Sequence, residues 1–188
     1  MNNSFFAVLY RMRYIERWAL MRATEKENLS EHSLDVAILT EALINIANIR
    51  FDAKLDANLG SNLALYHDVP EIITGDLPTP IKYHDEIMEN AYKKIEKQAI
   101  DRLLDKLPED FKDIYKEKFE ENADYEPYIK AADKLAALIK CIEERKAGNN
   151  EFKLAESQAR NHISLELPAA KVFITEFLPA FELTLDEL

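Results

Sequence analysis

The stretch "YHDVPEIITGDLPTPIKYHD", at residues 66–85, contains the tripeptide Tyr-His-Asp twice. The first copy follows the apolar helical segment "LGSNLALY", so the side chain of His67 is predicted to reach the interior. The second copy opens a segment dense in Lys and Glu, where Asp85 favours the positive end of a helix dipole and His84 has no apolar context. We therefore interpret the second copy as a solvated helix start and the first as the candidate site.

Outside this stretch the periodicity is helical nearly throughout, and the chain contains only three glycines. We expect helices over about residues 4–22, capped by Ser4, and 30–47, capped by Ser30. Further helices are expected over about 56–68, 85–107 and 128–148, a shorter one from Pro108, and two more separated by Pro168. Pro70 lacks an N–H, so the helix carrying His67 must kink, end or restart there. The sequence predicts one all-α domain, a helical bundle spanning residues 1–188.

Two other predicted helices place possible metal ligands in apolar surroundings. His32 lies in the first turn of "SEHSLDVA", and Asp133 lies within the alanine- and leucine-rich "YIKAADKLAALIK". A carboxylate on an apolar helix face is costly unless it is paired or bound to a metal. Together with His67 and Asp68, these residues offer two imidazoles and two carboxylates. Such a set suits a transition metal better than calcium or magnesium, which prefer oxygen ligands.

Composition narrows the range of partners. The 188 residues are 47% hydrophobic and 31% charged, with a net charge of −11. A surface that binds DNA or RNA polymers needs a dense basic face, which this sequence lacks, whereas one arginine and a metal can bind a small phosphate ester. No apolar run is long enough to cross a membrane, and the N-terminus does not resemble a signal peptide, so we expect a cytoplasmic protein. Cys141 is expected to be a small core residue.

The order His32, His67-Asp68, Asp133 is the H…HD…D signature of the HD-domain phosphohydrolases. The segments "RWALMR", "ENLSEHSLDVA", "LYHDVPEIITGDLPTPIKY" and "AGNNEF" resemble the bacterial 5′-deoxynucleotidase (YfbR-like) branch of that superfamily. The resemblance extends from Phe5 to the C-terminal "LTLDEL". It implies an all-helical bundle that forms homodimers and hydrolyses deoxyribonucleoside 5′-monophosphates to the deoxynucleoside and phosphate.

The same resemblance implies roles for individual residues. One divalent transition metal per chain, with Co, Mn, Fe, Ni, Zn and Cu as candidates, is expected to be held by His32, His67, Asp68 and Asp133. Glu71 matches the catalytic carboxylate, and Arg17 and Trp18 match the pair that handles phosphate and sugar. Asp76 and Thr79 match loop residues near the substrate phosphate.

The chemistry of phosphate monoester hydrolysis explains these residue types. A divalent metal lowers the pKa of its bound water and polarises the phosphoryl oxygen. Glu71 can orient or deprotonate that water, or protonate the leaving 5′-oxygen. Arg17 offers a planar, bidentate donor to phosphate oxygens. If Arg17 and Trp18 lie on a helix, they point about 100° apart, so that arginine can hold the phosphate while the indole bounds the sugar.

Simpler interpretations exist for three of these residues. Arg17 can be a surface arginine, Trp18 a core residue and Asp76 a turn residue. Two other functions also stay open for the whole chain. It can be another HD-type phosphohydrolase or phosphodiesterase acting on a dinucleotide, a cyclic nucleotide or a nucleoside triphosphate, or a non-catalytic metal-binding helical module.

Overall fold

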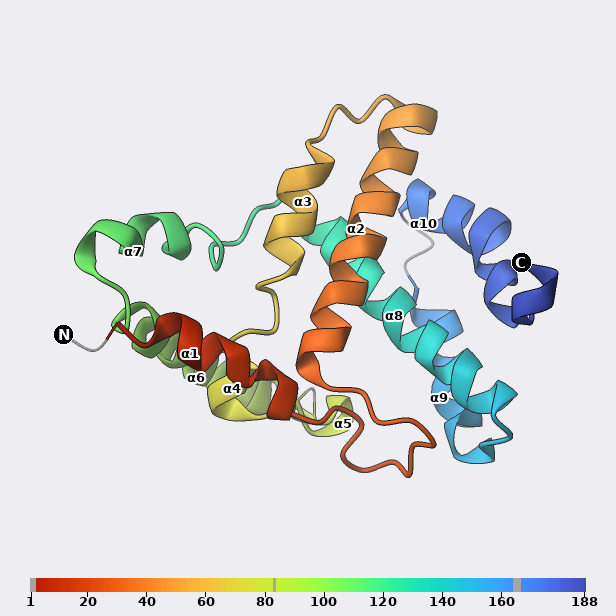
Figure 1. Cartoon of the computed structure of the whole chain (residues 1–188), viewed down its shortest axis with the longest axis horizontal. Helices are drawn as coiled ribbons and strands as arrows, with labels where there is room; N and C mark the ends of the chain where they lie inside the picture. Colours follow the sequence, from red (N-terminus) through yellow and green to blue (C-terminus); the bar gives the residue numbers. More distant parts are fainter. Residues whose placement is uncertain (1–2, 83, 164–166) are drawn as a thin grey trace. The chain divides into compact units, whose positions relative to one another are not determined.

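A computed structural model describes residues 3–82, 84–163 and 167–188, and the side chains of Thr79, Pro80 and His162 lie outside the description. Its regular structure is helical (Figure 1). Among these residues the β structure is limited to one isolated antiparallel bridge, between Glu16 and Asn28. The predicted all-α fold class is confirmed.

The longest helices are α2 (Leu29–Phe51), α6 (Glu86–Leu104) and α8 (Glu126–Lys146). The shorter α-helices are α1 (Phe5–Leu9), α3 (Ala57–Ala64), α4 (Glu71–Thr74), α5 (Thr79–Lys82), α7 (Glu109–Lys116), α9 (Lys153–His162) and α10 (Pro168–Val172). Single turns of other helix types are η1 (Tyr10–Tyr14), η2 (Asn150–Phe152), η3 (Phe173–Phe177), η4 (Leu178–Glu182) and η5 (Leu185–Glu187).

The chain forms two compact units. The first comprises the chain up to Leu20 together with Lys26–Ser33 and Leu65–Glu120, and the second comprises Met21–Glu25, Leu34–Ala64 and Glu121–Leu188. Helix α2 contributes its first turn to the first unit and its remainder to the second. The single domain spanning residues 1–188 stays a prediction.

The core of the first unit gathers apolar residues from α1, η1, the start of α2 and the end of α6. It consists of Phe5, Met12, Leu29, Val69, Leu103, Leu104 and Leu107. Leu29 and Val69 are fully buried in this cluster. Because each stands within three residues of a predicted metal ligand, burial of these two side chains fixes the backbone on which the candidate site is built.

The main core of the second unit lies along α2, α8 and α10, with Leu43, Leu135 and Ile142 among its fully buried residues. Cys141 is also fully buried, as the sequence predicted. Helix α8 ends at Lys146, and Gly148, two residues later, has a φ of +85°, which suits glycine. The N–H of Gly148 donates to the carbonyl of Arg145, and the N–H of Asn149 donates to that of Glu144, which is a Schellman ending.

A buried ion pair ties Met21–Glu25 to α8 within the second unit. The Lys140 ammonium donates to Glu144 Oε1 at 2.7 Å and to the Glu25 carbonyl at 2.6 Å. Glu144 also accepts the backbone N–H groups of Thr24 and Glu25 and the side-chain amide of Asn149. The carboxylate therefore has four donors, and it holds a segment that is more than a hundred residues away in sequence.

Two of the predicted helices end several residues before the expected position. The first helical region ends at Tyr14, not near Arg22, because Ile15 is extended and the following residues pair with the segment before α2. The third helix ends at Ala64, before His67, and a new helix, α4, begins at Glu71 directly after Pro70. The sequence left open whether the helix kinks, ends or restarts at Pro70. In the structure one helix ends before Pro70 and another begins directly after it.

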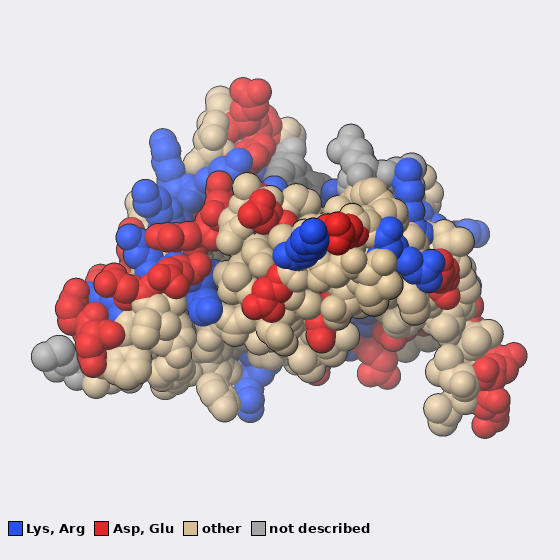
Figure 2. All heavy atoms as spheres, turned by 90° about the horizontal axis from the view of Figure 1, so that it is seen from above, with Lys and Arg blue, Asp and Glu red and all other residues tan. Residues whose placement is uncertain are grey.

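On the face shown in Figure 2, Lys and Arg side chains stand among Asp and Glu side chains, with uncharged surface between them. Within the described part of the chain, no helix combines the length and the apolar character needed to cross a membrane.

Candidate metal centre and active site

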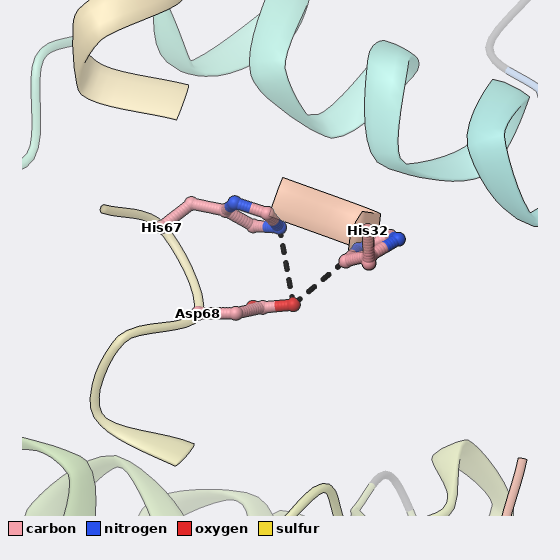
Figure 3. Close-up of side chains that lie close together, drawn as sticks. All are labelled: His32, His67 and Asp68. Atoms are coloured by element: carbon pink, nitrogen blue, oxygen red, sulfur yellow. Dashed lines mark ion pairs between the residues drawn. The ribbon is translucent and has the colours of Figure 1, made fainter. Parts of the chain in front are cut away.

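Three predicted metal ligands converge in the first unit. His32 lies in the first turn of α2, and His67 and Asp68 lie in the turns between α3 and α4. The Nε2 atoms of His32 and His67 lie 3.4 and 3.1 Å from Asp68 Oδ2, and both rings face this oxygen (Figure 3). One ligand atom from each residue lies within 4.8 Å of the other two.

These separations fit a divalent metal ion. Two donor atoms bound at about 2.1 Å, with angles between octahedral and tetrahedral values, lie roughly 3.0–3.4 Å apart. The observed nitrogen–oxygen distances of 3.1 and 3.4 Å fall in that range. Two imidazoles and a carboxylate are also a donor set that suits transition metals.

The local sequence explains how the cluster is held. Asn28 Oδ1 accepts the backbone N–H groups of Ser30 and Glu31, and Glu31 accepts the N–H of Asn28 in return. This capping box begins α2 two residues earlier than the predicted Ser30 cap and places His32, fully buried, in the first turn. On the other side, buried Val69 anchors the turn that carries His67 and Asp68.

Asp68 is ionised in this arrangement. Burial raises the pKa of its carboxyl group, but the neighbouring His67 and His32 imidazoles outweigh that effect and hold the pKa well below its usual range. Arg17 adds a further positive charge, since its Nη1 donates to Asp68 Oδ2 at 3.3 Å. A carboxylate that is negative at neutral pH is the form that binds a metal.

Glu27 joins two of the predicted substrate-binding residues, Arg17 and Trp18, to the predicted metal ligand His32. Its Oε1 lies 3.2 Å from Arg17 Nε and 3.2 Å from His32 Nδ1, and its Oε2 accepts the Trp18 indole N–H at 2.7 Å. Burial raises the pKa of the Glu27 carboxyl group, but the contacts with His32, Arg17 and Trp18 lower it by a larger amount. The net shift of this pKa is therefore downward. Sequence reasoning missed Glu27, which looks like an ordinary polar residue before a helix cap.

Arg17 and Trp18 do not lie on a helix. The backbone N–H of Arg17 donates to the Glu27 carbonyl at 3.0 Å, and the N–H of Leu29 donates to the Ile15 carbonyl at 2.9 Å. Trp18 has a φ of +61°, a left-handed conformation that costs a non-glycine residue about 1–2 kcal/mol. The predicted 100° divergence of the two side chains on a helix is therefore wrong, and contacts to Glu27 fix their directions instead.

Glu71, the predicted catalytic residue, is the first residue of α4 and is only 4% exposed. Its Oε1 lies 3.7 Å from the ammonium of Lys82, and its buried Oε2 accepts no hydrogen bond from the described residues. Burial, together with the negative charges of Asp68 and Asp76, raises the pKa of Glu71 to about 9.

Lys82 is a second residue that received no role from the sequence. Its ammonium pairs with Glu96 at 3.0 Å and lies 4.5 Å from the centre of the Tyr92 ring. Burial lowers the pKa of Lys82, but the charges of Glu96 and Glu71 outweigh burial and raise it. Lys82 lies within "TGDLPTPIKY", a segment on which the family resemblance rests. Its position there could have marked it as a candidate site residue.

The remaining predicted residues are placed less fully. Asp76 is half-buried in the first unit, where burial raises its pKa and the charge of Arg17 acts to lower it. Thr79 begins α5, and its side chain lies outside the described residues. Asp133 is half-buried on α8 in the second unit, and its role as a ligand stays a prediction. His84 is exposed just before α6, where Asp85 caps the helix, as expected.

The helical fold with its His…His-Asp cluster is that of the HD-domain phosphohydrolases. An HD-domain phosphohydrolase from Listeria innocua superimposes with a TM-score of 0.79 at 22% identity, covering 95% of this chain and 88% of that one. A cyanophage S-2L HD phosphohydrolase, bound to dA and one catalytic Zn²⁺ ion, superimposes with a TM-score of 0.67 at 19% identity, covering 95% and 96%.

Within that class, the family model described as "5′-deoxynucleotidase YfbR-like" matches residues 4–181. A 5′-deoxynucleotidase of Shewanella oneidensis is 46% identical over 187 residues, which are 97% of this chain and 96% of that protein. A 5′-deoxynucleotidase YfbR of Salmonella arizonae is 44% identical over 188 residues, 98% and 94% of the two chains. The chain belongs to the YfbR-like 5′-deoxynucleotidase family.

Proposed function

We propose that this 5′-deoxynucleotidase hydrolyses deoxyribonucleoside 5′-monophosphates and that one divalent transition metal ion per chain takes part. The observation that carries the proposal is the convergence of His32, His67 and Arg17 on one oxygen of Asp68. A metal-ligand cluster is thereby joined to a guanidinium group that suits phosphate. The relatives named as 5′-deoxynucleotidases support the same substrate class.

His32, His67 and Asp68 would hold the metal, with Asp133 as the proposed fourth ligand. When bound, the ion supplies a Lewis acid and a water molecule of lowered pKa. The catalytic Zn²⁺ of the cyanophage relative supports a metal in this fold, although the donor set here is also compatible with Co, Mn, Fe, Ni or Cu.

Arg17 would bind the phosphate oxygens of the substrate. Its guanidinium lies between two carboxylates, 3.2 Å from Glu27 and 3.3 Å from Asp68, and its side chain is only 13% exposed. A planar donor held in this way loses little freedom when it forms a bidentate contact with phosphate. Asp76 and Thr79 are proposed to border the same phosphate site.

Glu71 would donate a proton to the leaving 5′-oxygen. With a pKa near 9 it carries its proton at neutral pH in the absence of metal, and a bound cation lowers that value. As the bond from phosphorus to the 5′-oxygen breaks and a water oxygen bonds to phosphorus, the Glu71 carboxyl donates its proton to the departing 5′-oxygen, and the resulting carboxylate takes one proton back from the water-derived oxygen of the phosphate. The deoxynucleoside then leaves as a neutral alcohol.

Trp18 would favour deoxyribose over ribose. Its indole N–H is held by Glu27, so the ring has a fixed direction. A flat apolar ring beside C2′ offers a 2′-hydroxyl no hydrogen-bond partner. Burying an unpaired hydroxyl costs roughly 1–3 kcal/mol, which corresponds to about 5- to 150-fold discrimination. Trp18→Ala should narrow the ratio of the rates with dAMP and AMP, whereas Arg17→Ala should weaken both rates alike.

The test is phosphate release from a panel of deoxyribonucleoside and ribonucleoside mono- and triphosphates and cyclic nucleotides. The proposal expects dAMP and other deoxyribonucleoside 5′-monophosphates to be hydrolysed faster than their ribonucleoside counterparts. Equal rates with AMP and dAMP would contradict the sugar preference. Preferred hydrolysis of triphosphates or cyclic nucleotides would favour another HD-type reaction.

We also propose a homodimer. The implied family association supports it, as do the exposed apolar side chains of Leu34, Ile38 and Ile49 on α2. Light scattering at micromolar concentration should give twice the mass of one 21.7 kDa chain. A mass of one chain would contradict the dimer without touching the proposed reaction.

A further inference from the structure

We propose that Glu27 is a positioning residue that orients metal ligand His32 and substrate-binding residues Arg17 and Trp18 together. The inference rests on the proposed function, because it assigns Glu27 a part in the same reaction. None of the proposed steps uses Glu27.

The side chain of Glu27 divides its two oxygens between three neighbours. Oε1 is shared by Arg17 Nε and His32 Nδ1, each at 3.2 Å, while Oε2 accepts the indole N–H of Trp18 at 2.7 Å. The carboxylate is 12% exposed, and the imidazole that it faces is completely buried. Displacing Glu27 therefore disturbs all three partners.

His32 uses its two ring nitrogens for different purposes. Nε2 faces Asp68, on the side of the metal cluster, and Nδ1 faces Glu27. A carboxylate beside the second nitrogen keeps a proton there, which leaves the first nitrogen free to bind a metal and fixes the ring plane. Loss of such a partner typically weakens metal binding by roughly 10- to 100-fold.

The backbone of Glu27 supports the same arrangement. Its carbonyl accepts the N–H of Arg17 at 3.0 Å, next to the bridge between Glu16 and Asn28. Trp18 follows directly, in its left-handed conformation with a φ of +61°. An unfavoured backbone conformation persists only where surrounding contacts hold it, and the side-chain bond to Glu27 is one of those contacts.

Trp18 is the only tryptophan, so the fluorescence of the metal-free protein reports on this contact without an added label. The variants to compare are Glu27→Ala, Glu27→Gln and a control, Glu16→Gln. Glu16 stands beside Arg17 in sequence, but its ion pair with Lys26 is exposed and worth little. Glutamine can still accept the indole N–H, but it lacks the charge that faces Arg17 and His32.

Three readouts are measured on each variant: Co²⁺ affinity of the metal-free protein, tryptophan emission with acrylamide quenching, and the kinetics of dAMP and AMP hydrolysis at saturating metal. We expect both Glu27 variants to bind Co²⁺ about 10- to 100-fold more weakly than wild type. Glu27→Ala should also shift the emission to longer wavelength, raise KM for dAMP and narrow the dAMP-to-AMP ratio. Glu27→Gln should keep most of the emission, and Glu16→Gln should match wild type.

An unchanged Co²⁺ affinity or an unchanged emission spectrum in Glu27→Ala would overturn the proposal. Weakened metal binding that accompanies loss of helical circular dichroism would also overturn it, since Glu27 would then serve general stability. The affinity and emission readouts do not depend on catalysis. Suppose that wild type hydrolyses no nucleotide while the Co²⁺ affinity and the tryptophan emission of Glu27→Ala still change as expected. That result would contradict the proposed function and would leave the positioning role of Glu27 standing.

Discussion

Glu71 and Glu144 are buried to nearly the same extent but have opposite surroundings. Glu144, 2% exposed, accepts hydrogen bonds from Lys140, Asn149 and two backbone N–H groups. Burial raises its pKa, but these donors outweigh burial and lower the pKa to about 2. Glu71, 4% exposed, has one ammonium at 3.7 Å and two acidic neighbours, and its pKa rises to about 9.

The contrast separates a structural carboxylate from a chemical one. Four donors fix Glu144 as an anion and leave it little capacity for proton transfer at neutral pH. Glu71 has a buried oxygen that no described residue satisfies, an arrangement that folding alone does not favour. Such a group is a candidate for chemistry because burial and its acidic neighbours strongly perturb its pKa.

The largest expected effect is on catalysis by Glu71. Glu71→Gln keeps the shape of the side chain and removes its titration, so dAMP hydrolysis should fall by about 10²- to 10⁴-fold. Bound metal, measured by elemental analysis of the same sample, should stay at the wild-type level. Loss of metal together with activity would instead make Glu71 a ligand and would break the contrast with Glu144.

The second largest expected effect is a loss of folding stability when Glu144 is replaced. Glu144→Gln removes the negative partner of buried Lys140, and breaking a buried ion pair in this way costs about 3–5 kcal/mol. Urea unfolding should show this loss, whereas Glu71→Gln should show no comparable loss. Glu143→Gln, an exposed neighbour on α8, is the control. A Glu144→Gln protein as stable as wild type would show that the buried network is not an anchor.

The two carboxylates should also respond to pH in opposite directions in the metal-free protein. The raised pKa of Glu71 stabilises the fold below its ordinary value of 4.5, and this contribution is lost as pH rises towards 9. The lowered pKa of Glu144 stabilises the fold above 4.5, and this contribution is lost as pH falls towards 2. Each slope is at most about 1.4 kcal/mol per pH unit. Urea unfolding of wild type, Glu71→Gln and Glu144→Gln at several pH values measures how each carboxylate changes the slope of stability against pH. Slopes of the same sign for the two carboxylates would contradict the contrast between them.

The smallest effect concerns Lys82. Its ammonium lies 3.7 Å from Glu71 Oε1, so Lys82→Met should raise the Glu71 pKa seen in the pH–rate profile by roughly one unit or more. Lys93→Met removes an exposed lysine that pairs with Glu89 on α6, and it should leave the profile unchanged. A profile that moves equally in both variants would reflect overall charge and not the contact with Glu71.

Helical periodicity predicted the fold class well because most of the chain folds through amphipathic helices. It failed over residues 15–22, where "ERWALMR" contains good helix formers but the backbone pairs with the segment before α2. The contacts that override local propensity there come from Glu27 and Asn28, and no spacing rule connects them to Arg17 and Trp18. The local sequence therefore predicted a helix where tertiary contacts impose a left-handed tryptophan.

In the candidate site, too, some residues could be predicted from the sequence and others could not. His32, His67 and Asp68 were predictable because ligand-type side chains in apolar surroundings are unusual, and the structure places them together. Glu71 was predicted from the resemblance, and its local structure was left open because of Pro70; the structure ends α3 at Ala64 and begins α4 at Glu71. Glu27, Lys140 and Glu144 look like surface charges in sequence, and only the fold shows that Glu27 is partly buried and that Lys140 and Glu144 are buried.

The most direct test of the central claim is a titration of metal-free protein with Co²⁺, in which bound metal and dAMP hydrolysis are measured on the same samples. Activity should rise in proportion to bound metal and saturate at one ion per chain, with neither metal nor activity in Asp68→Ala. Full dAMP hydrolysis by the metal-free protein, or tight metal binding by Asp68→Ala, would contradict the central claim.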